Sequence, residues 1–216
     1  MFDKLNPYPM CYCNSGKKLK FCCGANKNNL AKVTIEDLNG VSRTMLLDPT
    51  YYMYTPEELE LLKELFDLEN TLKIEDVPAA YQKYMEEHPD FDKAFISYLS
   101  FLVANDQNTL ALEEAEKYKS LYPQYWHSYA HIASICFTTH QEEKAIAALK
   151  EMPFVEVINP QDCVAILRLM LIEAIYNKNE DREKELTKTI LCINPHDNFI
   201  LSTLAEVKEE YSKLAK

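Results

Sequence analysis

A short segment centred on proline recurs four times along the chain, and this repetition limits the possible folds more than any other feature. The prolines are Pro89, Pro123, Pro160 and Pro195, and the intervals between them are 34, 37 and 35 residues. Proline cannot continue a preceding helix, and it disfavours helical geometry at the residue before it. Each unit therefore ends at a fixed point and a new helix begins after it, which predicts a series of helix pairs.

Helical signals dominate from residue 55 onward. Thr55 is a suitable N-cap, Pro56 occupies the first helical position, and two acids follow. A second helix is expected from Pro78 to about His88. The chain has only three glycines, and this scarcity argues against a turn-rich β-sandwich and against a glycine-rich phosphate loop.

The interval of about 34 residues, with a proline closing each unit, resembles the tetratricopeptide repeat. Alignment on the prolines places small residues where paired helices approach closely: Ala111, Ala115, Ala133, Ala145 and Ala205. Leu99 and Met170 occupy other positions where that family has small residues. The expected fold class is therefore all-α, with a tetratricopeptide-like helical-repeat body over residues 55–216. An irregular helical bundle with coincidental prolines is the alternative.

Stacked helix pairs of this kind present a concave surface that usually binds a peptide. Fixed offsets from each proline, counted along the first helix of each pair, predict the residues of this groove as Lys93, Ser100, His127, Ser134, Phe137, Leu167, Leu171 and Phe199. The register is mainly apolar and lacks the Asn- and Arg-rich cluster that holds acidic peptide tails, so we expect apolar or basic peptide segments as ligands. The alternative is that Leu167 and Leu171 belong to the core.

Four of the seven cysteines lie within thirteen residues in the spacing C-x-C-x8-C-C: Cys11, Cys13, Cys22 and Cys23. Zn²⁺ binds four ligands in a tetrahedron, and two close cysteine pairs separated by a loop can enclose it without a larger fold. Gly16 allows a tight turn after the first pair. Four thiolates leave a negative charge, which is favourable beside the neighbouring lysines Lys17, Lys18 and Lys20. The segment therefore predicts a metal site.

This segment resembles the SEC-C zinc motif, named for the carboxy-terminal tail of the preprotein translocase motor ATPase. The family pattern is close to C-x-C-G-S-G-K-K-aromatic-K-x-C-C, and the chain matches it at the four cysteines, Ser15, Gly16 and the three lysines. Asn14 stands where glycine is common, and Leu19 stands where an aromatic residue is usual. The resemblance implies Zn²⁺ as the cofactor and a docking role toward chaperones, ribosomes or translocation machinery.

Two other interpretations of the cysteine cluster stay open. A metal knuckle can simply hold the N-terminal segment together without binding a partner. A redox function would use Cys22 and Cys23 as a dithiol, but adjacent cysteines form a strained disulfide. The other three cysteines, Cys136, Cys163 and Cys192, are scattered among aliphatic residues, so we expect them to be buried as small apolar residues.

Charge separates a basic head from an acidic body. Residues 1–32 carry six lysines and one acid, a net charge of +5, whereas the rest carries 17 basic and 33 acidic residues, a net charge of −16. Such a body argues against nucleic acid as a partner, except for contact between the basic head and ribosomal RNA. The N-terminus lacks a signal pattern, and the most apolar stretch, residues 163–176, is shorter than the roughly 20 residues that cross a bilayer. We expect a cytoplasmic protein without membrane spans.

The sequence thus predicts three segments. Residues 1–31 form the SEC-C metal-binding module, residues 32–54 form a linker or a small hairpin around Asn39-Gly40, and residues 55–216 form the helical domain. The first functional hypothesis is a zinc-binding adaptor without enzymatic activity, because the sequence has no nucleophile elbow, phosphate loop or dinucleotide motif. The second is a carrier or sensor of Zn²⁺ or Fe²⁺ that uses the four thiolates. An enzyme is the third.

Overall fold

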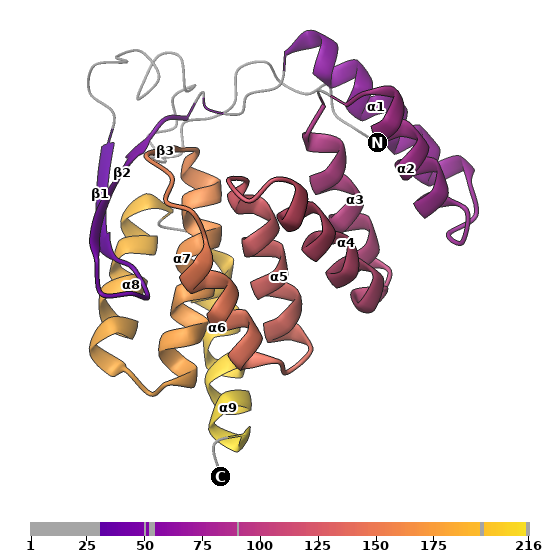
Figure 1. Ribbon diagram of the computed structural model, residues 1–216. Coiled ribbons are helices and arrows are strands. Elements are labelled where there is room, and N and C mark those ends of the chain that lie inside the picture. Colours follow the sequence, from indigo (N-terminus) through magenta and orange to yellow (C-terminus); the bar gives the residue numbers. More distant parts are fainter. Residues whose placement is uncertain (1–30, 50, 52–54, 90, 195–196, 215–216) are drawn as a thin grey trace. The chain divides into compact units, whose positions relative to one another are not determined.

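A computed structural model describes residues 31–49, 51, 55–89, 91–194 and 197–214 of the protein. Most of these residues are helical, and three short strands form one sheet (Figure 1). A mainly helical body is confirmed, although the sheet is an addition to the expected all-α class. Among the described residues, no helix has the length and apolar character required to cross a membrane.

The chain divides into two compact units. The helical unit is Met53–Ala148, and the mixed unit combines the described parts of Met1–Tyr52 and Leu149–Lys216. The boundaries differ from the single helical domain predicted over residues 55–216. The physical reason is that the hairpin near residue 40 hydrogen-bonds with the chain after residue 149, so the C-terminal helices share a unit with the hairpin.

The helical unit begins with a helix that is capped as the sequence predicts. The Thr55 hydroxyl accepts a hydrogen bond from the Glu58 backbone N–H at 3.2 Å, and the Glu58 carboxylate accepts one from the Thr55 N–H at 2.7 Å. This reciprocal pair satisfies two N–H groups at the helix start. The helices of the unit are α1 Pro56–Thr71, α2 Val77–Glu87, α3 Lys93–Ala104, α4 Asn108–Leu121, α5 Trp126–Thr138 and the first part of α6 Glu142–Glu151.

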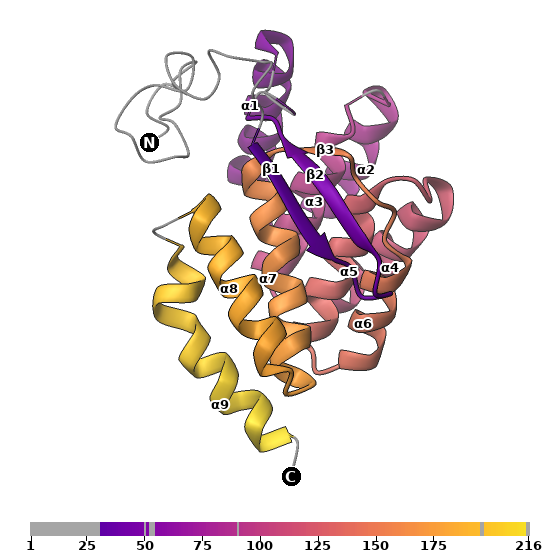
Figure 2. The same ribbon diagram turned by 90° about the vertical axis from the view of Figure 1, so that its left-hand side faces the viewer.

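The mixed unit contains the sheet and the C-terminal helices. Its elements are β1 Ala31–Glu36, β2 Ser42–Leu47, β3 Val157–Ile158, α7 Pro160–Tyr176, α8 Glu180–Ile193, a π-helical segment Phe199–Thr203 and α9 Leu204–Leu214. β1 and β2 pair antiparallel, with Glu36 opposite Ser42, and β3 pairs parallel to β2. The turn between β1 and β2 contains Gly40 with a φ of 76°. The hairpin around Asn39-Gly40 is confirmed, and it lies beside α7 (Figure 2).

The helix pairs α3–α4, α5–α6 and α7–α8 share one type of turn. In each turn one residue has a positive φ, which is 58° at Asp106, 55° at His140 and 55° at Lys178. The N–H of the next residue donates to a carbonyl five residues earlier, as in a Schellman C-cap: Gln107 to Leu102 at 2.9 Å, Gln141 to Cys136 at 2.8 Å and Asn179 to Ala174 at 2.8 Å. The described chain therefore repeats a helix–turn–helix unit in its geometry as well as in its sequence.

Pro160 differs from the layout that the repeat predicts. The chain after α6 first forms β3, and α7 then starts directly at Pro160. The Asn159 side chain caps this helix by accepting a hydrogen bond from the Gln161 N–H at 2.8 Å, and its amide nitrogen donates to the Tyr51 carbonyl at 3.1 Å. Because Asn159 is fixed by the segment after the hairpin, this proline begins a helix at the sheet edge.

Each unit has its own apolar core. Fully buried side chains in the helical unit include Tyr81 and Tyr98, whose rings stack with centroids 5.1 Å apart, and those in the mixed unit include Leu47, Ile158 and Ile190. Four of the five predicted small residues are buried where helices approach, whereas the fifth, on α9, is exposed: Ala111, Ala115, Ala133 and Ala145 against Ala205.

The three scattered cysteines divide into buried and exposed positions. Cys136 and Cys163 are buried as predicted, but the prediction for Cys192 is wrong because its side chain is exposed. Its helix, α8, buries Leu186, Ile190 and Ile193, which share one face, and position 192 falls off that face.

Candidate functional site

The predicted metal site lies outside the described residues. This applies to its four proposed ligands and to its basic neighbours: Cys11, Cys13, Cys22, Cys23, Lys17, Lys18 and Lys20. Across the ranges that the structure does describe, no group of three or more His, Cys, Asp or Glu side chains is placed to hold a metal ion. Zinc binding by the N-terminal cysteines therefore stays a prediction.

The residues predicted to line a peptide groove do not share one accessible surface. Five of them are buried: Lys93, His127, Phe137, Leu167 and Leu171. Ser100 and Ser134 are exposed, and Phe199 is half-buried. The set is also divided between the helical unit and the mixed unit.

The structure places Leu167 and Leu171 in the core, since neither side chain has any exposed surface. Eight other residues of α7 are buried as well, so this helix is apolar around most of its circumference. A register counted from Pro160 therefore cannot separate a binding stripe from core positions on this helix. Lys93 is also paired within its own unit, because its ammonium forms an ion pair with Glu58 at 2.7 Å.

Two histidines of α5 are held in the neutral state. Burial lowers the pKa of His127 to about 3, with a smaller contribution from the neighbouring His131, and burial lowers the pKa of His131 to about 4. The Trp126 ring stacks on His127 with centroids 3.7 Å apart. These histidines pack as neutral aromatic side chains at pH 7.

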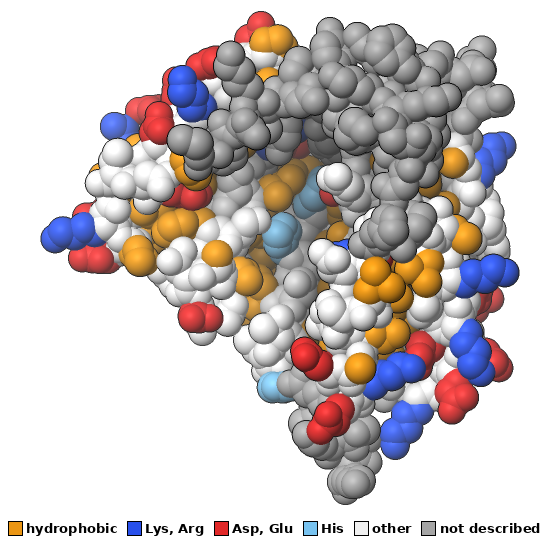
Figure 3. Space-filling view, turned by 180° about the vertical axis from the view of Figure 1, so that it is seen from behind, with side chains coloured by type: hydrophobic (Ala, Val, Ile, Leu, Met, Phe, Trp, Pro, Cys, Tyr) orange, Lys and Arg blue, Asp and Glu red, His pale blue; other side chains and the backbone are white. Residues whose placement is uncertain are grey.

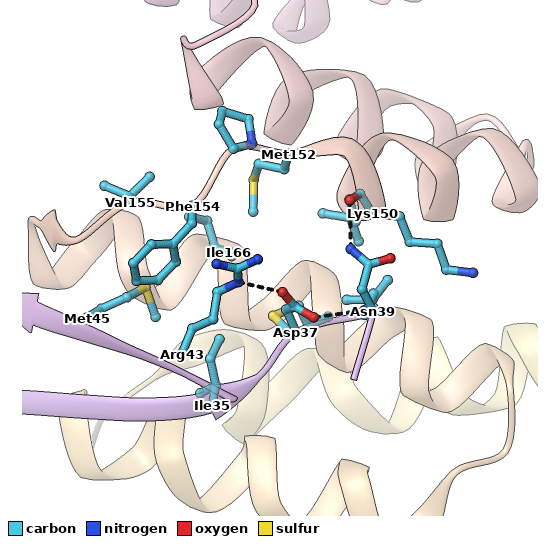
Figure 4. Close-up of a pocket in the computed structure, with 14 residues that line it drawn as sticks. Ile35, Asp37, Asn39, Arg43, Met45, Lys150, Met152, Phe154, Val155 and Ile166 are labelled. Atoms are coloured by element: carbon cyan, nitrogen blue, oxygen red, sulfur yellow. Dashed lines mark hydrogen bonds and ion pairs between the residues drawn. The ribbon is translucent and has the colours of Figure 1, made fainter. Parts of the chain in front are cut away.

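A pocket of about 100 Å³ lies within the mixed unit and was not anticipated from the sequence (Figure 4). It is enclosed by the β1–β2 hairpin, the end of α6, the loop that follows α6, and α7. Its apolar wall consists of Ile35, Met45, Leu149, Met152, Ile166 and Met170. Ile35 and Met45 are buried because alternate side chains of the hairpin face inward, toward α7.

One carboxylate organises the polar side of this pocket. Asp37 follows β1, and its Oδ1 accepts hydrogen bonds from the N–H groups of Asn39 at 2.8 Å and Val41 at 3.0 Å. Its Oδ2 forms an ion pair with Nε of Arg43 at 2.6 Å. Partial burial acts to raise the pKa of Asp37, but the Arg43 hydrogen bond and the two N–H donors outweigh it and hold the pKa below its ordinary value.

The hairpin turn is also fixed to the end of α6. The Asn39 side-chain amide donates to the Lys150 carbonyl at 3.0 Å. Arg43 then extends from β2 toward the loop after α6, where its guanidinium carbon lies 5.1 Å from the centroid of the Phe154 ring. Figure 4 shows the guanidinium between Asp37 and Phe154, with Met152 across the pocket from it. The position of Arg43 is therefore set from two sides.

Two nitrogens of Arg43 stay available to the pocket. The ion pair with Asp37 uses Nε, and Nη1 and Nη2 form no hydrogen bond with any other residue in the described part of the chain. The lining contains two basic residues, Arg43 and Lys150, and one acid, Asp37, in a protein with a net charge of −11. The pocket thus combines an apolar wall with oriented N–H donors and a locally positive balance.

Part of this pocket could have been predicted from the sequence. Asp37 and Arg43 flank the Asn39-Gly40 turn, and a hairpin places residues at the two ends of its turn close together. Phe154 comes from a segment more than a hundred positions away, and no local pattern indicates that it reaches the hairpin.

A second pocket is lined by residues of α8 and α9. Its apolar residues are Leu191, Cys192 and Leu204, and Glu183, Lys184 and Lys188 border them. It is more open to solvent than the pocket beside the hairpin. Figure 3 shows the face opposite to that of Figure 1, on which hydrophobic side chains lie beside charged ones.

Comparisons of the chain with protein-family models, with curated proteins and with solved structures found no match. What the pocket can bind follows from its own residues. An apolar wall can contact an aliphatic group, and the free edge of a guanidinium can donate hydrogen bonds to two oxygens of one carboxylate or phosphate. A small ligand with an aliphatic part beside an anionic group matches both features.

Proposed function

We propose that the protein is a zinc-binding adaptor of the cytoplasm that holds protein partners and has no enzymatic activity of its own. The observation that carries the proposal is the C-x-C-x8-C-C cluster within thirteen residues of a basic N-terminal head. Two close cysteine pairs supply the four thiolates that a structural Zn²⁺ requires. The partners proposed for this head are chaperone, ribosome or translocation components.

The four ligands are Cys11, Cys13, Cys22 and Cys23. Bound zinc would supply the folding free energy that so short a segment lacks, because a structural zinc ion stabilises the folded form directly. The lysines between the two cysteine pairs offset the negative charge of the four thiolates and give the head a positive surface for an acidic protein or ribosomal RNA.

The body supports an adaptor through its repeated helix pairs. In three successive pairs of the described chain the same positive-φ turn joins the two helices, and stacks of such pairs commonly serve as scaffolds for peptide partners. We propose a divergent tetratricopeptide-like arrangement for this body. Its acidic charge favours basic or neutral protein partners over nucleic acid.

The test is elemental analysis of the natively purified full chain by inductively coupled plasma mass spectrometry, together with protein mass spectrometry of what co-purifies. We expect one equivalent of zinc per chain and co-purified chaperone, ribosomal or translocation proteins. The double variant C22S/C23S should lose the zinc. Cys192→Ser is the matched control, because Cys192 is exposed and lies far along the chain from the cluster. Retention of one zinc ion by C22S/C23S would show that the four-cysteine assignment is wrong.

The alternative function, a carrier or sensor of Zn²⁺ or Fe²⁺, uses the same four thiolates and makes a different prediction. A carrier must release its metal, so it would bind with micromolar rather than much tighter affinity. Substoichiometric metal or bound iron, without a co-purified partner, would favour the carrier over the adaptor.

A further inference from the structure

We propose that the pocket beside the hairpin binds the C-terminal residue of a peptide, with the aliphatic side chain inside the cavity and the terminal carboxylate on Arg43. The choice of a peptide as the ligand rests on the adaptor function proposed above. The pocket itself rests on the geometry of the hairpin, the end of α6 and α7.

The size of the cavity selects a single side chain. Its volume is about 100 Å³, whereas pockets for cofactors and other small molecules usually measure about 300–1,000 Å³. Since one water molecule occupies about 30 Å³ in the liquid, the cavity holds about three groups of that size. A branched aliphatic side chain such as that of valine or leucine has this bulk.

The geometry of Arg43 selects a carboxylate. Its Nε is held by Asp37 at 2.6 Å, which leaves the edge formed by Nη1 and Nη2 facing the pocket (Figure 4). Two parallel N–H groups on a planar guanidinium match the two oxygens of a carboxylate. Asp37 acts as a positioning residue, because it holds the guanidinium through the side that the ligand does not use.

The hydrogen bonds of Asp37 argue against a free amino acid as the ligand. An amino acid brings an ammonium group that needs an anionic partner, but Asp37 already accepts hydrogen bonds from Arg43, Asn39 and Val41. The last residue of a peptide has a carboxylate and no ammonium group. The charge of the lining, with two basic residues and one acid, fits that ligand.

The rim of the pocket favours a peptide over a short free acid. Phe154 lines the pocket and yet keeps 43% of its surface exposed. A ligand that fills only the cavity leaves this ring in water, whereas the residue preceding a peptide C-terminus can cover it. The exposed ring therefore offers contact area to a chain that continues out of the pocket.

The experiment uses the natively purified full-length protein with ¹³C-methyl-labelled methionine. The probe is acetyl-Gly-Gly-Leu with a free carboxylate, compared with the same peptide as its C-terminal amide. We expect saturable shifts of the methyl signals of Met45, Met152 and Met170, which line the cavity. The amide should bind about tenfold more weakly or worse, because it cannot form the charge-assisted pair with Arg43.

Arg43→Gln separates the carboxylate contact from the cavity. The variant should bind the acid peptide as weakly as wild type binds the amide, and it should bind the amide with unchanged affinity. Lys188→Gln removes the same charge from an exposed position on α8 and should leave both affinities unchanged. If Arg43→Gln fails to fold, the comparison of acid and amide on the wild-type protein decides alone.

Three results would overturn the inference. Equal binding of acid and amide by wild type would show that Arg43 does not recognise a carboxylate. Binding of isovalerate as tight as that of the peptide would identify a free short acid as the ligand. No methyl shift at millimolar peptide would show that the cavity is not a site. None of these affects zinc content or co-purified partners, so failure of the pocket and failure of the adaptor proposal are distinguishable.

Discussion

After α2, α4 and α8 the described residues form the same backbone hydrogen bond, but the two units place different side chains at its donor residue. In each case the backbone N–H three residues after the helix C-cap donates to the C-cap carbonyl: Phe91 to His88 at 3.0 Å, Tyr125 to Tyr122 at 2.9 Å and Asp197 to Asn194 at 3.1 Å. The helical unit places an aromatic ring at this position, whereas the mixed unit places a carboxylate with no exposed surface.

The buried carboxylate of Asp197 has four donors. Arg168 contributes Nε at 3.2 Å and Nη2 at 2.6 Å, Asn194 contributes its side-chain amide at 3.1 Å, and Ile200 contributes its backbone N–H at 3.2 Å. An aromatic ring at the turn needs no such partners, since it carries no charge to desolvate. The comparison shows that the same backbone hydrogen bond is compatible with an aromatic side chain or with a buried carboxylate whose hydrogen bonds are satisfied.

The largest expected effect comes from removal of this carboxylate. Asp197→Ala leaves the Arg168 guanidinium and two N–H groups without their acceptor, so we expect a loss of about 3–5 kcal/mol in the free energy of unfolding. Urea denaturation followed by circular dichroism measures it. Asp181→Ala, at a fully exposed acid on α8, is the control and should change the free energy by less than about 0.5 kcal/mol.

A double variant turns the ionic turn into an apolar one. If an apolar pair of side chains stabilises this segment as well as the ion pair does, R168M/D197L should regain most of the free energy of unfolding lost in Asp197→Ala. Its free energy of unfolding should lie within about 1–2 kcal/mol of wild type. A double variant as unstable as the single one would show that the turn of the mixed unit depends on the ion pair in a way that the helical unit does not.

Lowering the pH should destabilise the helical unit before the mixed unit. His127 and His131 have pKa values near 3 and 4 in the folded protein because they are buried, whereas an unfolded histidine has a pKa of about 6.5. Below pH 6.5 the unfolded chain therefore binds more protons than the folded chain, and stability falls as the pH falls toward the folded pKa values. The loss should approach about 1.4 kcal/mol per pH unit for each histidine.

The single tryptophan lets this loss be assigned to one unit. Trp126 belongs to the helical unit and stacks on His127, so its fluorescence reports unfolding there. We expect its urea midpoint to fall between pH 7 and pH 5. His131→Gln should reduce the fall, and His140→Gln, at an exposed position, should preserve it. An unchanged midpoint in wild type would contradict neutral buried histidines.

Local features of the fold were predictable from the sequence. The capping box at Thr55 and the hairpin around Asn39-Gly40 each depend on residues a few positions apart. The series of helix pairs followed from the spacing of the prolines. In the first two cases the residues that form the structure also stand together in the sequence, and in the third the helix-ending residue recurs at a regular interval.

Features that depend on distant segments were not predictable. The pairing of β3 with β2 and the Asn39–Lys150 hydrogen bond join segments more than a hundred positions apart, and they move the C-terminal helices into the unit of the hairpin. They also create the pocket, whose Arg43 and Phe154 come from those two segments. For the same reason the predicted groove positions Leu167 and Leu171 proved to be core, since α7 is covered by elements that a helical register does not reveal.

The smallest expected effect tests what the two units share. Asp106 in the helical unit and Lys178 in the mixed unit hold φ values of 58° and 55°, where an L-residue is strained by about 1–2 kcal/mol. Glycine removes that strain and adds about 0.5–1 kcal/mol of unfolded-state entropy, so Asp106→Gly and Lys178→Gly should each stabilise the protein by about 0.5–1 kcal/mol. Lys178→Ala, which keeps the strain, is the control for loss of the side chain. Equal gains from both glycines, measured by urea denaturation, would show that this turn is equivalent in the two units. A gain in one unit alone would show that the units differ in the turns within helix pairs as well as in the segments after α2, α4 and α8.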